Sequence, residues 1–314
     1  MSASRKFPEI CLVNKPIAHQ VNAMGRLETC LKEAGYRVRR TYHAEDAANS
    51  IVFVWSWGKA VIVRQKNPKA IILCMDHAYM PNRKKGVVNT AWSTPDMPCG
   101  LNGWGEHPLV EDNGARLMQQ DWLDFLKPLR KPKNKVALVF GQVFGDAAIQ
   151  GHVEEYPTWL RGMSEGLRKE GWETRFRPHP VTVRRGDAGR YGNVGRNSVE
   201  ASLYDALDNC SLTAAFNSNA CTEGYIYGIP ARVWNEGSML WPLVENPGLT
   251  TRVDEPVRRR WFEMLAYCQW TMEELSDGTW LKYHEPIMHR LVEGGACRPW
   301  HTLRFTETGL AANL

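Results

Sequence analysis

A histidine held between two prolines is the residue of this chain best suited to chemistry. The segment Arg177-Pro178-His179-Pro180 ends a stretch, 173–177, whose pattern predicts a β-strand. The prolines restrict the backbone on both sides of His179. Its imidazole can donate a proton or a hydrogen bond to a departing oxygen, and Arg177 would offset the charge that develops there. The alternative is a histidine that only caps the strand in a loop.

Small polar residues follow a second predicted strand, 212–216, and open a predicted helix over 220–227. Ser218 or Asn219 can cap that helix, whose free N–H groups then form an anion site. Glu223 lies one turn farther on, where a carboxylate can accept hydrogen bonds from ribose hydroxyls. The alternative is an ordinary helix start, with Asn219 as the N-cap and Glu223 favoured in the first turn by the helix dipole.

A loop with two glycines, Gly141-Gln142-Val143-Phe144-Gly145, directly follows the predicted strand 136–141. Glycines allow a bound group to approach the backbone closely, and free N–H groups can receive phosphate. We therefore count Gly141, Gln142 and Gly145 among the candidate donor-binding residues. An ordinary strand-to-helix turn explains the same pattern.

An acid at the end of the predicted strand 70–75 is our candidate general base. Asp76, with His77 beside it, could take the proton of an acceptor hydroxyl as that hydroxyl attacks a sugar. The alternative is a helix-capping aspartate. The irregular segment 80–113 offers three rival acids and bases, and three side chains suited to grip an acceptor. The rivals are Asp96, Glu106 and His107, and the acceptor contacts are Trp92, Asn102 and Trp104.

The segment 234–242 (WNEGSMLWP) combines apolar walls with a few polar groups, as ligand pockets do. It could border the base or the sugar of a donor. Core packing explains it equally well.

Buried apolar runs alternate with amphipathic stretches along both halves of the chain, which predicts strands buried on both faces of parallel sheets. We expect an α/β protein of two Rossmann-like domains facing a cleft, with a C-terminal helical tail. Residues 1–130 would form an acceptor-side domain and residues 136–255 a nucleotide-sugar-binding domain. Residues 256–314 would be helical, with one helix over 256–275, and would pack back on the N-terminal domain. The basic, proline-containing segment 127–135 would link the two domains.

Composition narrows the classes of protein further. The 314 residues carry a net charge of +5, which permits an acidic partner without requiring one. Eight cysteines show no metal-ligand spacing, and Cys11 and Cys74 fall inside predicted strands, as small buried hydrophobic residues would. No apolar stretch predicts export or membrane spanning, so we expect a cytoplasmic protein. The basic residues form clusters that are solvated surface or phosphate contacts, at 37–40, 83–85, 127–135, 184–185 and 258–260.

The combination of RPHP with a later strand, small polar turn and E-G-x-x-x-G-I-P helix resembles the donor domain of GT-B glycosyltransferases. It is most similar to families with an "HP" motif, namely sialyl-, Kdo- and CDP-glycerol-type transferases. The resemblance covers residues 136–241 and implies that His179 contacts the leaving phosphate. It also implies that Ser218 and Asn219 bind phosphate oxygens and that Glu223 binds the ribose. Asn217-Ser218-Asn219 stands where those families tend to have paired serines, which leaves the donor nucleotide open.

The whole chain also looks like bacteriophage proteins described as glycosyltransferases. The similar segments are 100–103, 141–146, 177–180, 237–242 and 268–275. Some phages glycosylate hydroxymethylated pyrimidines in their own DNA, so the resemblance implies double-stranded DNA with modified bases as one acceptor. The host cytoplasm would then be the site of action.

These observations predict a glycosyltransferase that moves a sugar from a nucleotide-sugar donor to a hydroxyl acceptor. No Asp-x-Asp motif occurs, so we expect no metal and no further cofactor. Two other classes stay open: a DNA-binding or structural phage protein with a degenerate transferase fold, and a nucleotide-sugar epimerase. No G-x-G-x-x-G follows the first strand, which disfavours a dehydrogenase.

Overall fold

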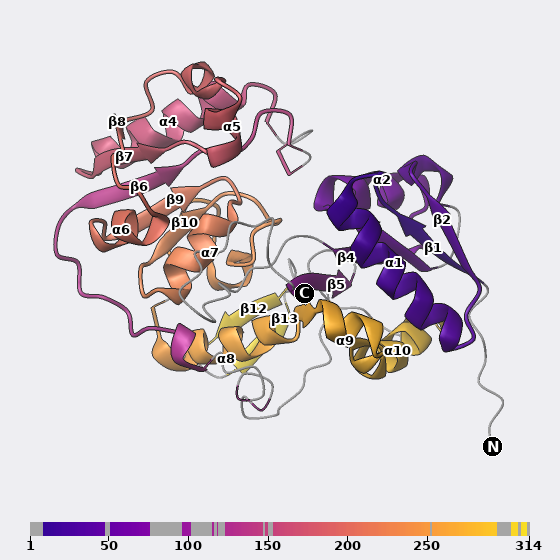
Figure 1. The fold of residues 1–314 in the computed structure, drawn as a ribbon. Coiled ribbons are helices and arrows are strands. Elements are labelled where there is room, and N and C mark those ends of the chain that lie inside the picture. Colours follow the sequence, from indigo (N-terminus) through magenta and orange to yellow (C-terminus); the bar gives the residue numbers. More distant parts are fainter. Residues whose placement is uncertain are drawn as a thin grey trace. The chain divides into compact units, whose positions relative to one another are not determined.

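The chain forms two units, each built around its own mainly parallel sheet (Figure 1). The first unit is Met1–Glu111 with Met264–Thr302, and the second is Asp112–Glu263 with Leu303–Leu314. The computed structural model describes residues 9–47, 51–75, 96–101, 115, 118, 123–146, 148–149, 153–251, 253–293, 303–306 and 309–312. Within this part of the chain, no helix is long and apolar enough to cross a membrane.

The first unit contains a six-stranded sheet in the order β11-β5-β4-β3-β1-β2. Its strands are β1 (Ile10–Val13), β2 (Val38–Thr41), β3 (Ile51–Trp55), β4 (Ile71–Met75), β5 (Asp96–Leu101) and β11 (Gln269–Thr271). Strands β1 to β4 are parallel, while β5 pairs antiparallel with both β4 and β11. Strands β1, β3 and β4 are apolar throughout and fully buried, as strands covered on both faces are, whereas β2 at the sheet edge is only half-buried.

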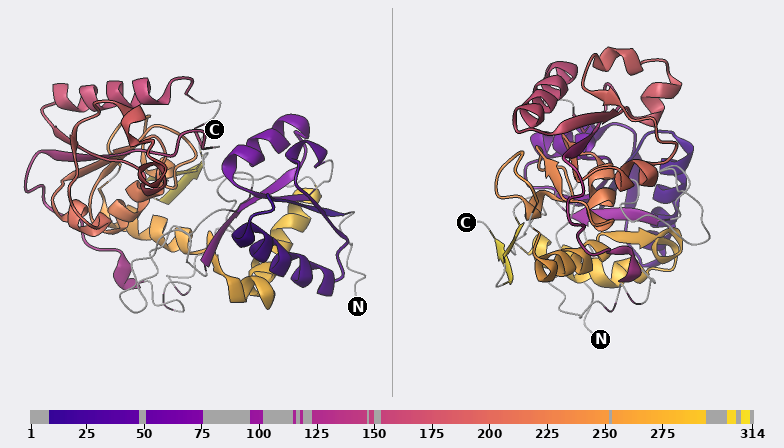
Figure 2. Two further views of the ribbon diagram at one scale, coloured as in Figure 1. Left: turned by 45° about the horizontal axis from the view of Figure 1, so that its top comes forward. Right: turned by 90° about the vertical axis from the view of Figure 1, so that its left-hand side faces the viewer.

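Helices cover both faces of this sheet, as the left view of Figure 2 shows for α1 and α2. They are α1 (Ala18–Glu33), η1 (Ala44–Asp46), α2 (Trp57–Lys66), α9 (Met272–Ser276) and α10 (Thr279–Val292). Alternate strand residues, such as Leu12 and Phe53, pack into one core with α1 and the C-terminal helices, including Trp280. Cys11 and Cys74 are fully buried free thiols, which confirms their predicted role as small hydrophobic side chains.

The second unit contains a five-stranded, wholly parallel sheet in the order β10-β9-β6-β7-β8. Its strands are β6 (Val136–Phe140), β7 (Glu173–Arg177), β8 (Arg196–Asn197), β9 (Leu212–Ala215) and β10 (Ala231–Val233). A separate antiparallel hairpin joins β12 (Leu303–Thr306) and β13 (Gly309–Ala312). Strands β6, β7, β9 and β10 lie within two residues of their predicted bounds.

Helices also cover both faces of the second sheet, with α4 on one face and α6 and α7 on the other (Figures 1 and 2). The helices are α4 (Tyr156–Lys169), α5 (Pro180–Arg184), α6 (Leu203–Asp208), α7 (Asn219–Ile226) and α8 (Glu255–Ala266). Short turns of 3-10 helix are η2 (Leu123–Phe125), η3 (Ala188–Tyr191) and η4 (Trp241–Leu243). Helix α7 packs closely on the sheet at Gly224, where a Cβ would lie 3.0 Å from the Thr213 methyl carbon.

The C-terminal segment differs from the predicted helical tail. The single helix expected over 256–275 is divided into α8 and α9, because residues 269–271 form β11 and extend the first sheet. Thr271 then begins α9 with a capping box to Glu274. Residues 264–302 belong to the first unit, whereas the hairpin of β12 and β13 belongs to the second. The division between the units also falls at 111/112, ahead of the predicted boundary near residue 130.

The predicted linker, 127–135, is instead fastened to the second unit. The N–H of Lys127 donates to the Ile226 carbonyl and that of Arg130 to the Gly228 carbonyl, each at 2.8 Å. The fully buried guanidinium of Arg258 donates to the Lys127 carbonyl at 3.0 Å and to the Tyr225 carbonyl at 2.9 Å. These bonds make the segment part of the fold at the end of α7.

Replacement of Gly228 by alanine tests this attachment. Gly228 has φ of +92°, and a Cβ there would collide with the Pro128 carbonyl oxygen. We expect Gly228→Ala to lower the free energy of unfolding by about 3 kcal/mol, from backbone strain and overpacking together. Gly166→Ala is the matched control. Its Cβ would meet nothing within 4 Å inside α4, so this variant should gain about 0.5–1 kcal/mol. Urea denaturation measures both, and an unchanged stability of Gly228→Ala would contradict the attachment.

Candidate functional site

The order of strands in the second unit marks the sheet edge between β6 and β9 as a candidate ligand site. The chain passes from β6 to β7 on one side and then returns to β9 on the other side of β6. In open α/β sheets, ligands bind outside the carboxyl ends of the strands at such a switch point. The loops that follow β6 and β9 both begin there, and His179 follows the neighbouring β7. The three predicted donor-binding segments therefore lie at one edge of one sheet.

Three side-chain amides connect the loops at this edge. The Gln142 Nε2 donates to Asn217 Oδ1 at 2.6 Å, and the Asn217 backbone N–H donates to Gln142 Oε1 at 3.3 Å. The Asn217 Nδ2 donates to Asn235 Oδ1 at 2.9 Å and to the Ala148 carbonyl at 3.0 Å. We call Gln142, Asn217 and Asn235 the amide belt. The amide belt connects the segments that follow β6, β9 and β10 to one another.

The belt changes the interpretation of the loop that follows β6. Gln142 is buried, and both polar atoms of its side chain are bonded to Asn217, so it holds the loops together. Gly141 is a packing position, because a Cβ there would lie 2.9 Å from the Tyr191 ring and 3.0 Å from that of Phe176. Gly145 has φ of +75° and open space where a Cβ would be, so it serves the turn.

Tyr191 ties the loop after β6 to the segment after β7. This fully buried side chain donates from its hydroxyl to the Gln142 carbonyl at 2.6 Å and also lies 3.1 Å from Thr182 Oγ1. Thr182 is in α5, which begins directly after His179. The position of His179 relative to the amide belt therefore depends on Tyr191. Nothing in the local sequence marks this tyrosine, because it lies in an irregular stretch between α5 and β8.

His179 is the N-cap of α5, and its Nδ1 accepts a hydrogen bond from the Val181 N–H at 3.1 Å. In the neutral ring the proton must then be on Nε2. Burial lowers the pKa of the imidazole, the nearby Asp146 opposes that effect, and the Arg184 and Arg185 charges add to it. The half-buried ring is thus a neutral N–H donor at pH 7.

Arg177 has a different place from the one predicted. Its Nη1 donates to the Glu200 carbonyl at 2.9 Å and lies 3.4 Å from Ser198 Oγ. These contacts hold the guanidinium to the segment that follows β8. The arginines whose charges act on His179 are Arg184 and Arg185 of the exposed α5 region, and Arg190 lies over the Phe144 ring at 4.3 Å.

The start of α7 has the predicted cap. Ser218 is its N-cap, and Oγ accepts a hydrogen bond from the Ala220 N–H at 3.3 Å. Asn219, the alternative cap, is the first residue of the helix. Both side chains are partly exposed, and no acidic residue occupies the first turn. The positive end of this helix is therefore open to an anion.

Glu223 has a neighbour that the sequence did not indicate. The Tyr204 hydroxyl of α6 lies 3.5 Å from Glu223 Oε2, and both side chains are half-buried. The Tyr204 ring in turn packs edge-to-face on Tyr227, with 5.1 Å between centroids. Glu223 thus presents a carboxylate held by a tyrosine on the adjacent helix.

The segment 234–242 was predicted either to border a donor pocket or to pack in the core, and its residues divide between these two roles. Asn235 belongs to the amide belt, while Met239 and Leu240 are buried in the core. The Met239 carbonyl accepts a hydrogen bond from the Trp261 indole at 2.9 Å.

Several predicted candidates lie outside the described residues: Asp76, His77, Trp92, Asn102, Trp104, Glu106 and His107. The backbone of Asp96 is in β5.

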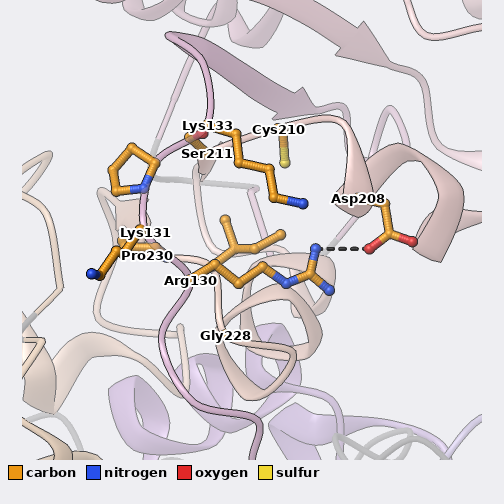
Figure 3. A pocket seen from close by; sticks show the side chains of 10 residues that line it. Arg130, Lys131, Lys133, Asp208, Cys210, Ser211, Gly228 and Pro230 are labelled. Atoms are coloured by element: carbon orange, nitrogen blue, oxygen red, sulfur yellow. Dashed lines mark hydrogen bonds and ion pairs between the residues drawn. The ribbon is translucent and has the colours of Figure 1, made fainter.

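The basic cluster of residues 127–135 lies at the opposite edge of the sheet. A small pocket there is lined by Arg130, Lys131 and Lys133 together with Ser211 and Pro230, which precede β9 and β10 (Figure 3). Arg130 forms an ion pair with Asp208 at 2.7 Å. The helices α6 and α7 end here, and cations stabilise helix carboxyl ends. This cluster therefore supports the fold at the amino edge and is separate from the loops around His179.

Loss of one belt residue should be costly. Asn217→Ala removes the partner of Gln142 and one partner of Asn235, and a buried polar group left unpaired costs about 1–3 kcal/mol. We expect the free energy of unfolding to fall by about 2–3 kcal/mol in urea denaturation. Asn246→Ala, an exposed asparagine of the same unit, should change it by less than about 0.5 kcal/mol. Equal effects of the two substitutions would mean that the belt does not stabilise this edge.

Comparison with known proteins bears on the fold. No protein-family model and no curated protein sequence matches the chain. Among solved structures, the chain is similar to the β-Kdo 2,7 transferase of Thermosulfurimonas dismutans KpsC, with a TM-score of 0.50 and 11% identity over 86% of this chain and 99% of that one.

Two further structures are less similar. The β-Kdo 2,4 transferase of the same KpsC has a TM-score of 0.44 and 16% identity over 72% of this chain and 79% of that one. The E. coli heptosyltransferase WaaC, bound to ADP-2-deoxy-2-fluoro heptose, has a TM-score of 0.28 and 10% identity over 72% and 88%. Of the three, the 2,7 transferase is similar enough to bear on the architecture. Together with the two parallel sheets described above, it confirms the predicted α/β class: the chain has the GT-B fold, with two Rossmann-like units.

Proposed function

We propose that the protein is a glycosyltransferase that moves a sugar from a nucleotide-sugar donor to a hydroxyl acceptor, with the donor bound by the second unit. The observation that supports this proposal most strongly is that two uncharged groups able to bind an anion lie at the same edge of the second sheet. His179 offers an Nε2–H donor after β7, and the Ser218-capped end of α7 offers backbone N–H groups after β9. Both are suited to a phosphate leaving group.

The spacing of the two devices fits a nucleoside phosphate. One strand, β6, lies between β7 and β9, so their ends are about 10 Å apart at the usual strand spacing. A nucleoside mono- or diphosphate can extend over that distance. Glu223, held by Tyr204 one turn into α7, would accept hydrogen bonds from the ribose. Arg184 and Arg185 would add positive potential around the phosphate that departs from the sugar.

The reaction would be a direct displacement. The acceptor oxygen attacks the anomeric carbon as the bond from that carbon to the phosphate oxygen breaks, and the electron pair leaves with the phosphate. His179 stabilises that oxygen through Nε2–H, and α7 stabilises it through its positive end. A general base must take the acceptor proton, and Asp76, directly after β4, is our choice. In this reaction His179 and the amino end of α7 stabilise the negative charge that develops on the leaving phosphate.

For the acceptor, we propose the hydroxyl of a hydroxymethylated pyrimidine in double-stranded DNA. The net charge of +5 permits a polyanionic partner, and the exposed pair Arg184 and Arg185 supports one. A phage origin would place the reaction in the host cytoplasm.

His179 should report binding directly. Since burial lowers its pKa, the free protein should show titration below 6.5, the ordinary value of the imidazole. The unfolded chain then binds the proton more tightly than the folded protein does. The neutral histidine therefore contributes to the free energy of unfolding above pH 6.5, and this contribution is lost as the pH falls through the pKa of the folded state. A bound phosphate favours the charged ring, so CDP or UDP should raise the pKa. Imidazole NMR titration of the free and nucleotide-bound protein checks this. A nucleotide that binds but leaves the His179 titration unchanged would contradict the role.

A screen of nucleotide sugars by thermal shift, followed by mass spectrometry of the products, tests the function. A donor that binds the folded state raises the melting temperature. Glu223→Ala should weaken that donor about tenfold, as loss of a charged hydrogen-bond partner does, whereas the exposed Glu154→Ala should not. Asp76→Asn should bind donor normally but fail to transfer the sugar. Binding of no nucleotide sugar, or normal transfer by Asp76→Asn, would overturn the respective assignments.

A further inference from the structure

The first unit has a switch point of its own, between β1 and β3. The chain goes from β1 to the neighbouring β2, then to β3 on the other side of β1, and on to β4. The helices α1 and α2, which follow β1 and β3, cover opposite faces of the sheet (Figure 2). The sheet edge outside the ends of β1 and β3 is therefore the position at which an α/β sheet of this order is expected to bind a ligand.

Both helices that start at this switch point have open amino ends. The N-cap residues are Ile17 for α1 and Ser56 for α2, and neither provides a side-chain capping bond. Neither helix has an acidic residue in its first turn. The helices are 16 and 10 residues long, so their positive ends are well developed. In the second unit Ser218 caps α7, whereas α4, like α1, has no side-chain capping bond.

Two lysines lie at the same sheet edge. Lys15 follows β1 by two residues, and Lys59 is in the first turn of α2, where its Nζ lies 3.4 Å from the Tyr42 carbonyl after β2. Burial and the charge of Lys15 lower the pKa of Lys59, and Glu45 opposes them. Glu45 itself is exposed and paired with His43 at 3.5 Å. Two like charges near two positive helix ends form a strong local potential for an anion.

A buried amide lies directly after β1. Asn14, the residue after β1, is fully buried, and its Nδ2 donates to the Lys15 carbonyl at 2.7 Å. Its Oδ1 has no hydrogen-bond partner among the described residues, at a cost of about 1–3 kcal/mol. Buried polar groups left unsatisfied concentrate where a ligand or an ordered water completes them. An oxygen acceptor here fits a ligand that carries a hydroxyl beside its anionic group.

Strain is also concentrated at this point. Ser56 has φ of +79° and is the one non-glycine residue with positive φ in the described part of the chain. Its N–H donates to the Met75 carbonyl at 2.7 Å, which joins the end of β3 to that of β4. Asp76, our proposed base, is the next residue along the chain. This sheet edge is thus adjacent in sequence to the group that would activate the acceptor.

We infer that the switch point between β1 and β3 binds a phosphate group of the acceptor substrate through Lys15, Lys59 and the amino ends of α1 and α2, with Asn14 accepting from a neighbouring hydroxyl. Lysine binds phosphate as a point charge, and helix amino ends supply N–H donors. That the ligand is the acceptor rests on the proposed function. The phosphate site itself does not, because it lies in the other unit from the donor loops.

Titration of the full-length, isotope-labelled protein with inorganic phosphate tests the site by NMR. Amide signals of residues 18–20 and 57–59 should shift, and Lys15→Gln and Lys59→Gln should each weaken binding about fivefold, as loss of one positive charge near the surface does. Lys69→Gln, an exposed lysine in the turn before β4, should bind phosphate as the parent does. Shifts confined to other regions, or equal affinities in all three variants, would overturn the inference.

Two esters separate the sources of the phosphate. Glycerol 3-phosphate represents a monoester with a free hydroxyl, and a ten-base-pair DNA duplex represents a diester. Shifts of the same amides by either ester support the site, and the tighter ester identifies the class of acceptor. If neither ester reaches these amides, the site does not serve an acceptor. CDP or UDP added to the same samples reports on the second unit separately, so a failed donor site and a failed phosphate site give different results.

Discussion

The hydrogen bonds between Gln142 and Asn217 are the interaction on which the proposed donor site depends. They join the loops after β6 and β9, and the second of these loops leads into the Ser218-capped start of α7 that is proposed to bind the phosphate. Tyr191 then extends the same network to α5, and so to His179. A parallel sheet fixes only where its strands end. The amides and the tyrosine convert that edge into loops of defined geometry, which a transferase needs for a leaving group that must be held as its charge grows.

The two switch points use different electrostatics. In the second unit the groups nearest the proposed phosphate are neutral: an imidazole N–H and backbone amides. The first unit has two ammonium groups at the corresponding place. Neutral, preorganised donors suit a charge that appears during the reaction, because they need little rearrangement as it develops. Fixed cations suit a charge that is present throughout, such as the phosphate of an acceptor. Two Rossmann-like units of one chain thereby support different tasks.

Local sequence patterns predicted strands such as β4, β6 and β9 because each of these is a short buried run bounded by turn residues. They also placed β7 at the observed bounds and put the capped helix α7 within one residue of its start. Strand β11 was missed, since three residues in an amphipathic stretch become a strand only by pairing with β5. The assignment of 127–135 as a linker failed for a similar reason: Gly228 and Arg258 fasten it from distant positions.

The site was predicted in part. His179 and Ser218 could be identified because prolines and a helix cap mark them locally. Gln142 was singled out for the wrong task, because a side chain after a strand looks the same in sequence whether it faces a ligand or another loop. Tyr191 and Tyr204 were missed, since their importance comes from partners 49 and 19 residues away. Asn235 lies in the predicted pocket segment 234–242, but its bond to Asn217, 18 residues away, could not be predicted from the local sequence.

A crystal structure of the protein with a bound nucleoside diphosphate is the most direct test of the central claim. We expect phosphate oxygens within hydrogen-bond distance of His179 Nε2 and of the first N–H groups of α7. The hydrogen bonds between Gln142 and Asn217 should be unchanged. A nucleotide bound elsewhere, with that edge of the sheet vacant at saturating concentration, would contradict the claim.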